Sequence, residues 1–118
     1  MAPFERLASE DFCYLTTVGR KSGKPHTIEI WFARENGNLY LLSGGGDAAD
    51  WVRNLRKTPA VRVRIGSRTV AARAREITKP DEDTLARRLL DEKYMGWKKG
   101  KRLSSWARNA LPVAVELS

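Results

Sequence analysis

The chain has 118 residues, and 22 lysines and arginines against 14 aspartates and glutamates give it a formal net charge of +8. Because one domain commonly has about 100–150 residues, we expect a single domain over residues 1–118. The composition is 42% apolar, which excludes a disordered tail. No apolar run approaches the roughly 20 residues that cross a bilayer, and the N-terminus has no signal pattern, so we expect no transmembrane segment and a cytoplasmic protein.

The net charge is concentrated in one segment. From Trp51 to Arg75 there are eight basic residues and no acidic one, and the charges of the remaining residues cancel. Such a segment can bind nucleic acid through phosphate contacts, or it can be an ordinary solvated surface.

Few side chains are available for self-contained catalysis. The single cysteine, Cys13, cannot form an internal disulfide, and the single histidine, His26, leaves too few ligands for a structural zinc site. A Ser-His-Asp or Cys-His arrangement would have to use His26, and no local motif supports either. We therefore expect no metal and, if the chain is an enzyme, a reactive group borrowed from a cofactor.

Strand and turn patterns fill the first third of the chain. Residues 12–18 are aromatic and β-branched and predict a strand, followed by a basic glycine loop at 19–25. Residues 26–34 predict a second strand. The Asn-Gly pair at 36–37 predicts a tight hairpin into a strand at 38–42, because both central positions of that turn need a positive φ.

This hairpin also predicts a register and two apolar faces. Three residues before the turn should pair with three after it: Ala33 with Tyr40, Phe32 with Leu41, and Trp31 with Leu42. A sheet with one solvated face would alternate more clearly between apolar and polar residues. The face with Trp31, Tyr40 and Leu42 therefore needs cover from a helix, a ligand or a second subunit, which makes a homodimer plausible.

A helix is predicted after the glycine run at 43–46. Asp47 is a suitable N-cap for it, and Trp51, Val52 and Leu55 fall on one face at helical spacing.

A second hairpin follows this helix. Residues 61–65 and 68–76 should pair through a tight turn at 66–67, with Val63 opposite Val70 and Arg62 opposite Ala71. The pairing places Arg62, Arg64 and Arg73 on one face.

The rest of the chain predicts a helix that opens at Pro80 and a closing strand at 112–117. Altogether the pattern predicts an α+β chain that is mainly β. About six antiparallel strands form a small barrel, with two or three helices at its side or ends.

Two segments have the chemistry of an anion site. The first is the loop after the first strand, where glycine amides, cations and a hydroxyl can contact a phosphate. It contains Gly19, Arg20, Lys21, Ser22, Gly23 and Lys24. The second is the run Ser43, Gly44, Gly45 and Gly46, which precedes a helix N-terminus. Either segment can also be an ordinary connection.

Three further residues have both a structural and a functional interpretation. His26 is either a strand-edge residue or faces a ligand. Tyr94 and Trp97 lie near glycines and can form a wall for a flat ring, or they can anchor the C-terminal segment.

The order of these segments resembles one family. Residues 15–25, the turn at 36–37, the glycine run at 43–46 and the stretch from Trp51 to Val61 are similar to the deazaflavin-dependent nitroreductase family of split-barrel oxidoreductases. The resemblance implies a split β-barrel that binds the 8-hydroxy-5-deazaflavin coenzyme F-420. It also implies hydride transfer from that coenzyme to a small acceptor such as a quinone, nitro compound or enone.

The resemblance also implies roles for individual residues. Arg20, Lys21, Ser22 and Gly23 would hold the coenzyme phosphate, and Ser43 to Ala49 would line its ring. Gly19, Lys24 and His26 would be further cofactor-binding residues. Trp51 and Asn54 would brace the following helix. Tyr94, the candidate catalytic residue, would form the acceptor pocket with Trp31 and Trp97.

Other interpretations remain at this point. Flavin mononucleotide is an alternative cofactor, a nucleic-acid-binding barrel without catalysis is an alternative function, and storage of the coenzyme without turnover is a third. Under the coenzyme hypothesis, the basic segment from Trp51 to Arg75 would attract the acidic tail of the coenzyme.

Overall fold

The computed structural model describes residues 10–117. Their seven strands are β1 (Cys13–Val18), β2 (Pro25–Ile30), β3 (Ala33–Glu35), β4 (Asn38–Ser43), β5 (Ala60–Ile65), β6 (Arg68–Glu76) and β7 (Leu111–Leu117). The helices are the short 3-10 turn η1 (Gly46–Ala48), α2 (Asp50–Lys57), α3 (Pro80–Met95) and α4 (Ser105–Asn109).

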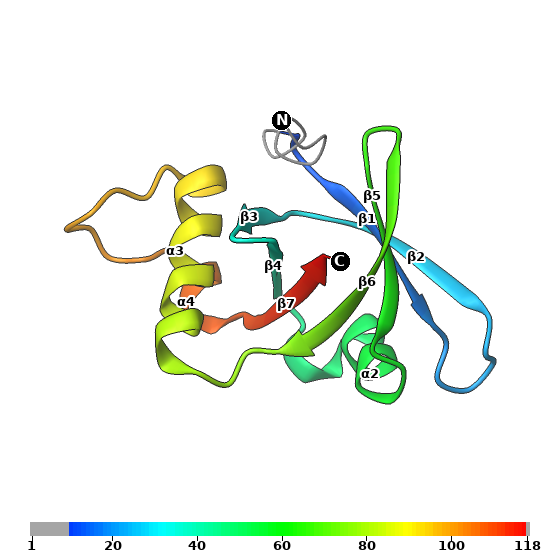
Figure 1. Cartoon of the computed structure of the whole chain (residues 1–118). Coiled ribbons are helices and arrows are strands. Elements are labelled where there is room, and N and C mark those ends of the chain that lie inside the picture. Colours follow the sequence, from blue (N-terminus) through cyan, green and yellow to red (C-terminus); the bar gives the residue numbers. More distant parts are fainter. Residues whose placement is uncertain (1–9, 118) are drawn as a thin grey trace.

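These strands form one antiparallel sheet in the order β2-β1-β5-β6-β7-β4-β3 (Figure 1). The sheet curls into a barrel whose two end strands, β2 and β3, do not pair with each other. Helices α3 and α4 lie together on one side, and α2 lies at one end of the barrel (Figure 1). The prediction of a split barrel with strands joined by hairpins is confirmed.

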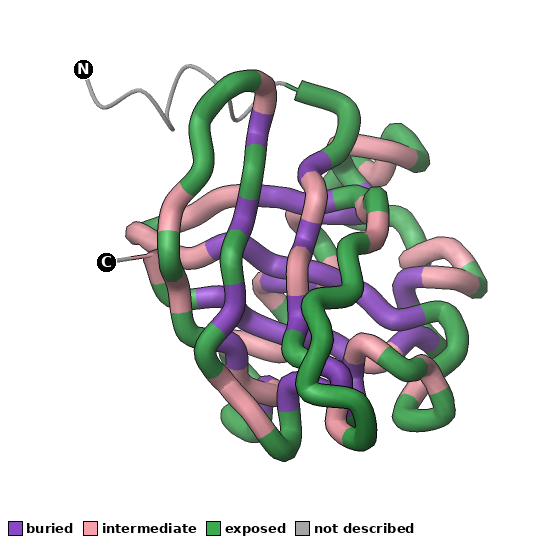
Figure 2. The backbone as a smooth tube through the Cα atoms, turned by 90° about the vertical axis from the view of Figure 1, so that its right-hand side faces the viewer, coloured by how far each residue is buried: buried purple, intermediate pink, exposed green. Residues whose placement is uncertain are grey.

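The main core lies inside the curled sheet. Exposed and buried residues alternate along β5, and Figure 2 shows such an alternation of burial along strands of the sheet. Val61, Val63 and Ile65 are the buried residues and belong to the main core. They pack with other buried residues of the core, including Leu41 of β4 and Phe32, which lies between β2 and β3. Because inward and outward positions alternate, the arginines of β5 necessarily lie on the outer face.

A second core lies between the sheet and α3. Tyr40 and Leu42 are 3% and 4% exposed and pack with Ala86 and Leu90 of the helix. The apolar second face of the hairpin is thus covered by a helix of the same chain. The prediction that this face needs cover is confirmed for Tyr40 and Leu42, and of the three alternatives the cover is a helix, while Trp31 stays 40% exposed.

The prediction of one strand over residues 26–34 is also wrong. β2 pairs with β1 and ends at Ile30. β3 begins at Ala33 and pairs instead with β4, at the other end of the sheet. Trp31 and Phe32 carry the chain across this split. The pair Ala33 with Tyr40 is confirmed, but the ladder ends there, so the two further pairs predicted for Phe32 and Trp31 do not form.

The local turn predictions are largely confirmed. Asn36 and Gly37 have φ values of 51° and 80°, as their turn requires. Val63 pairs with Val70 and Arg62 with Ala71.

Asp47, however, is not the N-cap of a helix. It lies within η1, and α2 begins only at Asp50, preceded by Ala49. The Ser43 hydroxyl donates to the Gly46 carbonyl at 2.9 Å and closes this turn before the helix starts.

Candidate functional site

A pocket of about 410 Å³ lies between the loop after β1, the first half of β2 and the start of α2. It is lined by Thr17, Gly19, Arg20, Lys21, Ser22, His26, Thr27, Ile28, Asp50, Trp51 and Asn54. The β1–β2 hairpin that carries most of these residues projects from the barrel (Figure 1). The pocket therefore opens beside an edge strand of the sheet.

Half of the predicted cofactor-binding residues meet here. These are Gly19, Arg20, Lys21, Ser22, His26, Trp51 and Asn54. The other predicted residues do not line the pocket, namely Gly23, Lys24, Ser43, Gly44, Gly45, Gly46 and Ala49. The glycine run is kept apart because it belongs to the self-closed turn after β4.

Four lining residues had not been singled out. Thr17 and Ile28 lie on the inner face of paired strands, and a strand alternation analysis of the first hairpin could have found them. Asp50 lies one helical turn before Asn54, which is also a sequence-level signal. Thr27 pairs with Thr16, and their hydroxyls are 2.7 Å apart.

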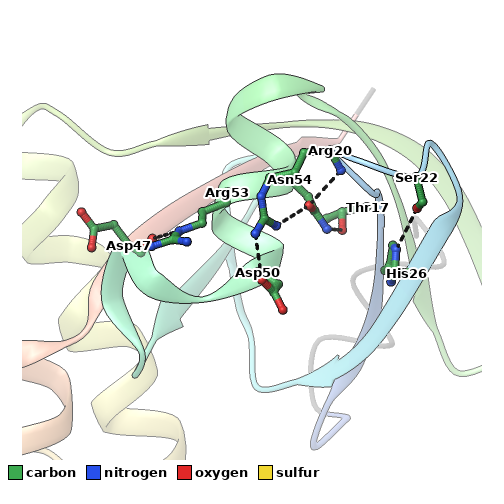
Figure 3. Close-up of polar contacts among 8 residues, drawn as sticks. All are labelled: Thr17, Arg20, Ser22, His26, Asp47, Asp50, Arg53 and Asn54. Carbon is green, nitrogen blue, oxygen red and sulfur yellow. Dashed lines mark hydrogen bonds and ion pairs between the residues drawn. The ribbon is translucent and has the colours of Figure 1, made fainter.

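Asn54 holds the loop in place (Figure 3). Its side-chain oxygen accepts from the Arg20 backbone N–H at 3.1 Å and from Arg20 Nη1 at 3.0 Å. Its amide nitrogen donates to Thr17 Oγ1 at 3.1 Å. Asn54 and Thr17 are 4% and 1% exposed, so these bonds join the helix to the loop and strand in a dry environment.

The charge of Arg20 is already compensated, whereas that of Lys21 is not. Arg20 Nη2 lies 3.1 Å from Asp50 Oδ1, and Lys57 donates to the Arg20 carbonyl at 2.9 Å. Lys21 is exposed and makes no hydrogen bond or ion pair with residues 10–117. An anion in this pocket therefore finds one fixed guanidinium and one ammonium without a partner.

Gly19, Ser22 and His26 pack closely at the rim. A Cβ on Gly19 would lie 2.6 Å from His26 Nε2 and 2.7 Å from Ser22 Oγ, so a larger residue would have to displace these side-chain ends. The Ser22 hydroxyl accepts from the Lys24 backbone N–H at 3.2 Å. Gly23, with φ of 71°, allows the turn that closes the loop.

A smaller pocket of about 250 Å³ lies at the other end of β2. Its walls are Phe12, Glu29, Ile30, Trp31, Leu42 and Trp106. The Trp31 ring stacks on the Tyr94 ring, with 4.4 Å between the ring centroids. It meets the Trp106 ring edge to face, with 5.4 Å between the centroids. Trp31 and Tyr94 are thus together as predicted, but Trp97 lines neither pocket and its indole donates to the Lys101 carbonyl.

The Tyr94 hydroxyl is engaged with backbone groups. It accepts from the Phe32 N–H at 3.0 Å and lies 2.7 Å from the Asp11 carbonyl oxygen. Burial raises the pKa of Tyr94 to about 12. This hydroxyl therefore stays protonated and fastens the Trp31–Phe32 crossing to α3.

The two pockets share the edge strand. Thr27 and Ile28 line the larger pocket, and Glu29, Ile30 and Trp31 line the smaller one. A strand rises about 3.3 Å per residue. The distance along β2 between the two pockets is therefore no greater than the length of a ring system.

The fold places the chain in the class of split antiparallel barrels, with a basic glycine loop beside an edge-strand pocket. Within that class, a family model described as F420H(2)-dependent quinone reductase matches residues 4–118. The chain belongs to this family, and the resemblance inferred from the sequence is confirmed.

Individual relatives agree with this assignment. An F420H(2)-dependent quinone reductase of Mycobacterium tuberculosis is 33% identical over 73 residues, which cover 58% of this chain and 48% of that protein. The chain thus spans about half the length of the curated relatives it matches.

Solved structures match more of the chain. One of an F420-H2 dependent reductase (FDR-A) has a TM-score of 0.66 at 27% identity, over 90% of this chain and 93% of that chain. Another, described as a domain-swapped dimer, has a TM-score of 0.67 at 25% identity, over 90% of this chain and 79% of that chain.

In residues 10–117, no helix is both long and apolar enough to span a membrane.

Proposed function

We propose that this chain binds reduced coenzyme F-420 in the larger pocket and serves hydride transfer to a small planar acceptor, such as a quinone, nitro compound or enone. The observation that supports this most is the unpartnered Lys21 beside the fixed Arg20, next to the apolar side chains of Ile28 and Trp51. The coenzyme contains a phosphate and a flat ring. This pocket offers hydrogen-bond donors for the phosphate and an apolar wall for the ring.

The donor set fits this cofactor. Lys21, Ser22 and Arg20 would hold the phosphate, with Asn54 keeping Arg20 in position. Ile28 and Trp51 would contact the ring and exclude water from one side of it. When bound, the reduced deazaflavin supplies the hydride, so the residues of the chain need only bind, orient and desolvate the reactants.

The acceptor is proposed to bind in the smaller pocket. Trp31 presents an exposed ring there whose other face is fixed by Tyr94, which suits stacking of a planar acceptor. The proposed role of Tyr94 is to position Trp31 and the chain crossing, because its hydroxyl is held by backbone groups.

Lys21→Ala is expected to weaken binding of reduced coenzyme F-420 by about 1–2 kcal/mol, which is the value of a charge-assisted hydrogen bond. Isothermal titration calorimetry with the purified protein measures it. Lys24→Ala is the matched control, because Lys24 lies in the same loop outside the pocket lining. Equal losses in the two variants would contradict a specific phosphate contact, and no binding by the wild type would sink the proposed function.

Trp31→Ala is expected to raise the KM for a quinone by about tenfold, a loss typical of an aromatic stacking contact, while cofactor affinity stays unchanged. Trp97→Ala, outside both pockets, should leave KM unchanged.

Tyr94→Phe should lower the free energy of unfolding by about 1 kcal/mol because backbone hydrogen bonds are lost. A fall in kcat of Tyr94→Phe far beyond that of Trp31→Ala would instead support a catalytic Tyr94.

The alternatives are tested with the same preparation. Tight binding of flavin mononucleotide without binding of the deazaflavin would favour the alternative cofactor. Arg62, Arg64 and Arg73 do share the outer sheet face, so oligonucleotide binding with steep salt dependence and indifference to the deazaflavin would favour a nucleic-acid-binding barrel. Tight deazaflavin binding without hydride transfer to any acceptor would indicate storage.

A homodimer is proposed on the strength of the solved relative that is a domain-swapped dimer. Sedimentation of the pure protein as a monomer would contradict it.

A further inference from the structure

The smaller pocket has aromatic walls and one carboxylate. Phe12, Trp31 and Trp106 supply the walls, and Glu29 is the one charged residue in the lining. The ring planes of Trp31 and Trp106 stand at 90° to each other, and the Tyr94 ring stacks on Trp31. Aromatic rings at right angles beside a carboxylate suit a substituted ammonium group, because the negative face of a ring attracts a cation.

The aromatic walls of this pocket are not packed into the core. Phe12 and Trp31 are each 40% exposed, and they are two of the four large apolar side chains that are exposed in residues 10–117. Phe32, the next residue after Trp31, is 0% exposed. Exposed aromatic surface that gathers at one hollow place is typical of a binding site.

Glu29 is held in place without being paired with a cation. It lies opposite Tyr14 in the β1–β2 ladder, and the Tyr14 hydroxyl donates to Glu29 Oε1 at 3.0 Å. The Arg64 guanidinium lies 4.1 Å from the centroid of the Tyr14 ring and donates to the Gly66 carbonyl. Glu29 itself forms no ion pair with residues 10–117. The pocket therefore contains an oriented negative charge that a cationic ligand can meet.

The overall charge of the chain opposes a cation, so the local arrangement has to select it. The formal net charge is +8. Interactions between exposed charges are screened beyond about 8 Å at physiological ionic strength, whereas a contact with Glu29 is shorter than that. Lys93 lies 5.1 Å from the centroid of the Tyr94 ring, but it donates to the Phe32 carbonyl and is not among the lining residues.

We propose that the smaller pocket binds a ligand that carries a substituted ammonium group, and that Glu29 determines this specificity. The inference rests on the proposed function for the role of that ligand, which would be the hydride acceptor. The substrate class is then a planar acceptor with a cationic substituent. The positive charge takes no part in the hydride transfer and serves binding alone. A neutral acceptor of the same shape loses the contact with the carboxylate.

Choline tests the cation site without the coenzyme. Its matched control is the neutral alcohol in which a carbon atom replaces the nitrogen. Binding is followed by the indole N–H resonances of the four tryptophans, each assigned from the variant that lacks it. Choline should shift the resonances of Trp31 and Trp106, which line the pocket, and should leave those of Trp51 and Trp97 unchanged.

The neutral alcohol should bind at least about tenfold more weakly than choline, because it has the shape of choline without the charge. Equal affinities for the two compounds would overturn the inference. The absence of a choline-dependent shift at Trp31 and Trp106 would overturn it as well.

Two variants separate the carboxylate from the charge of the whole chain. Glu29→Gln keeps an oxygen for the Tyr14 hydroxyl but removes the charge. Asp81→Asn removes the same charge from an exposed residue at the start of α3, outside the smaller pocket. Choline affinity should fall about tenfold in Glu29→Gln, to the level of the neutral alcohol, and stay unchanged in Asp81→Asn. A similar decrease in both variants would contradict a specific role of Glu29.

A pair of quinones extends the test to the proposed reaction. The two share one ring and a short chain, which ends in trimethylammonium in one and in tert-butyl in the other. With reduced coenzyme F-420 as the donor, the KM for the cationic quinone should be about tenfold lower in the wild type, and the two KM values should converge in Glu29→Gln. Equal KM values in the wild type would refute the inference and leave the proposed function intact. If neither quinone is reduced but choline binds beside Trp31, the proposed function fails and the cation site stands.

Discussion

Replacing Asn54 by alanine is expected to lower the free energy of unfolding by about 2–3 kcal/mol and to weaken cofactor binding at least about tenfold. The change removes the bonds to Arg20 and leaves the Thr17 hydroxyl, which is 1% exposed, without its donor. The Arg20 guanidinium then keeps only its contact with the exposed Asp50. Urea unfolding measures the first effect, and titration with reduced coenzyme F-420 measures the second.

Two further variants separate stability from positioning of the loop. Asn54→Asp keeps an oxygen for Arg20 but cannot donate to Thr17, so it should retain more affinity than Asn54→Ala. In the double variant Asn54→Leu with Thr17→Val, the buried Thr17 hydroxyl is removed together with its donor and only the part-buried Arg20 backbone N–H lacks a partner, so stability should partly return while affinity stays low. Recovery of both together would mean that Asn54 acts only through folding.

The sequence predicts those parts of the fold that short-range chemistry determines. The Asn36-Gly37 turn and the β5–β6 register follow from residues within a few positions, because positive φ values and tight loops leave few alternatives. The chemistry of the loop at 19–24, four residues of which line the larger pocket, is predictable for the same reason. Cations and glycines within a few residues indicate its chemistry whatever the tertiary structure.

Long-range features escaped the prediction. The sequence from His26 to Arg34 reads as one strand, because nothing local marks the point where β2 leaves β1 and β3 joins β4. The role of Asn54 depends on Thr17 and Arg20, which are 37 and 34 positions away. The glycine run looked like a second anion site, but the turn after β4 keeps it away from the pocket.

Removal of the Arg75 guanidinium is expected to have the second large effect. Arg75 on β6 binds Glu82 of α3 through two hydrogen bonds of 2.6 and 2.8 Å and contacts Glu116 of β7 at 2.6 Å. Tyr40 of β4 donates to the same Glu82 at 3.0 Å. Arg75→Met should lower the free energy of unfolding by about 2 kcal/mol, a value discounted because the Arg75 side chain is 38% exposed.

The effect should also depend on pH in a defined direction. Hydrogen bonds from Arg75 hold the pKa of Glu82 below its ordinary value. A carboxyl whose pKa is lower in the folded state than in the unfolded one stabilises the fold above the unfolded value, about 4.3, and loses that contribution as the pH falls through the folded value. The stability difference between wild type and Arg75→Met should therefore be constant near neutral pH and shrink in acid.

Arg56→Met is the matched control for this cluster. Arg56 forms a similar two-bond pair with Glu76, at 2.7 and 3.0 Å, but connects no third element of the fold. Its loss should cost less than that of Arg75, because exposed ion pairs contribute little. If the free energy of unfolding falls by the same amount in both variants, the Arg75 cluster stabilises the fold through its individual charge pairs alone. A larger loss of stability for Arg75→Met than for Arg56→Met, with part of that loss also seen in Glu82→Gln, would show that the cluster fixes α3 on the sheet.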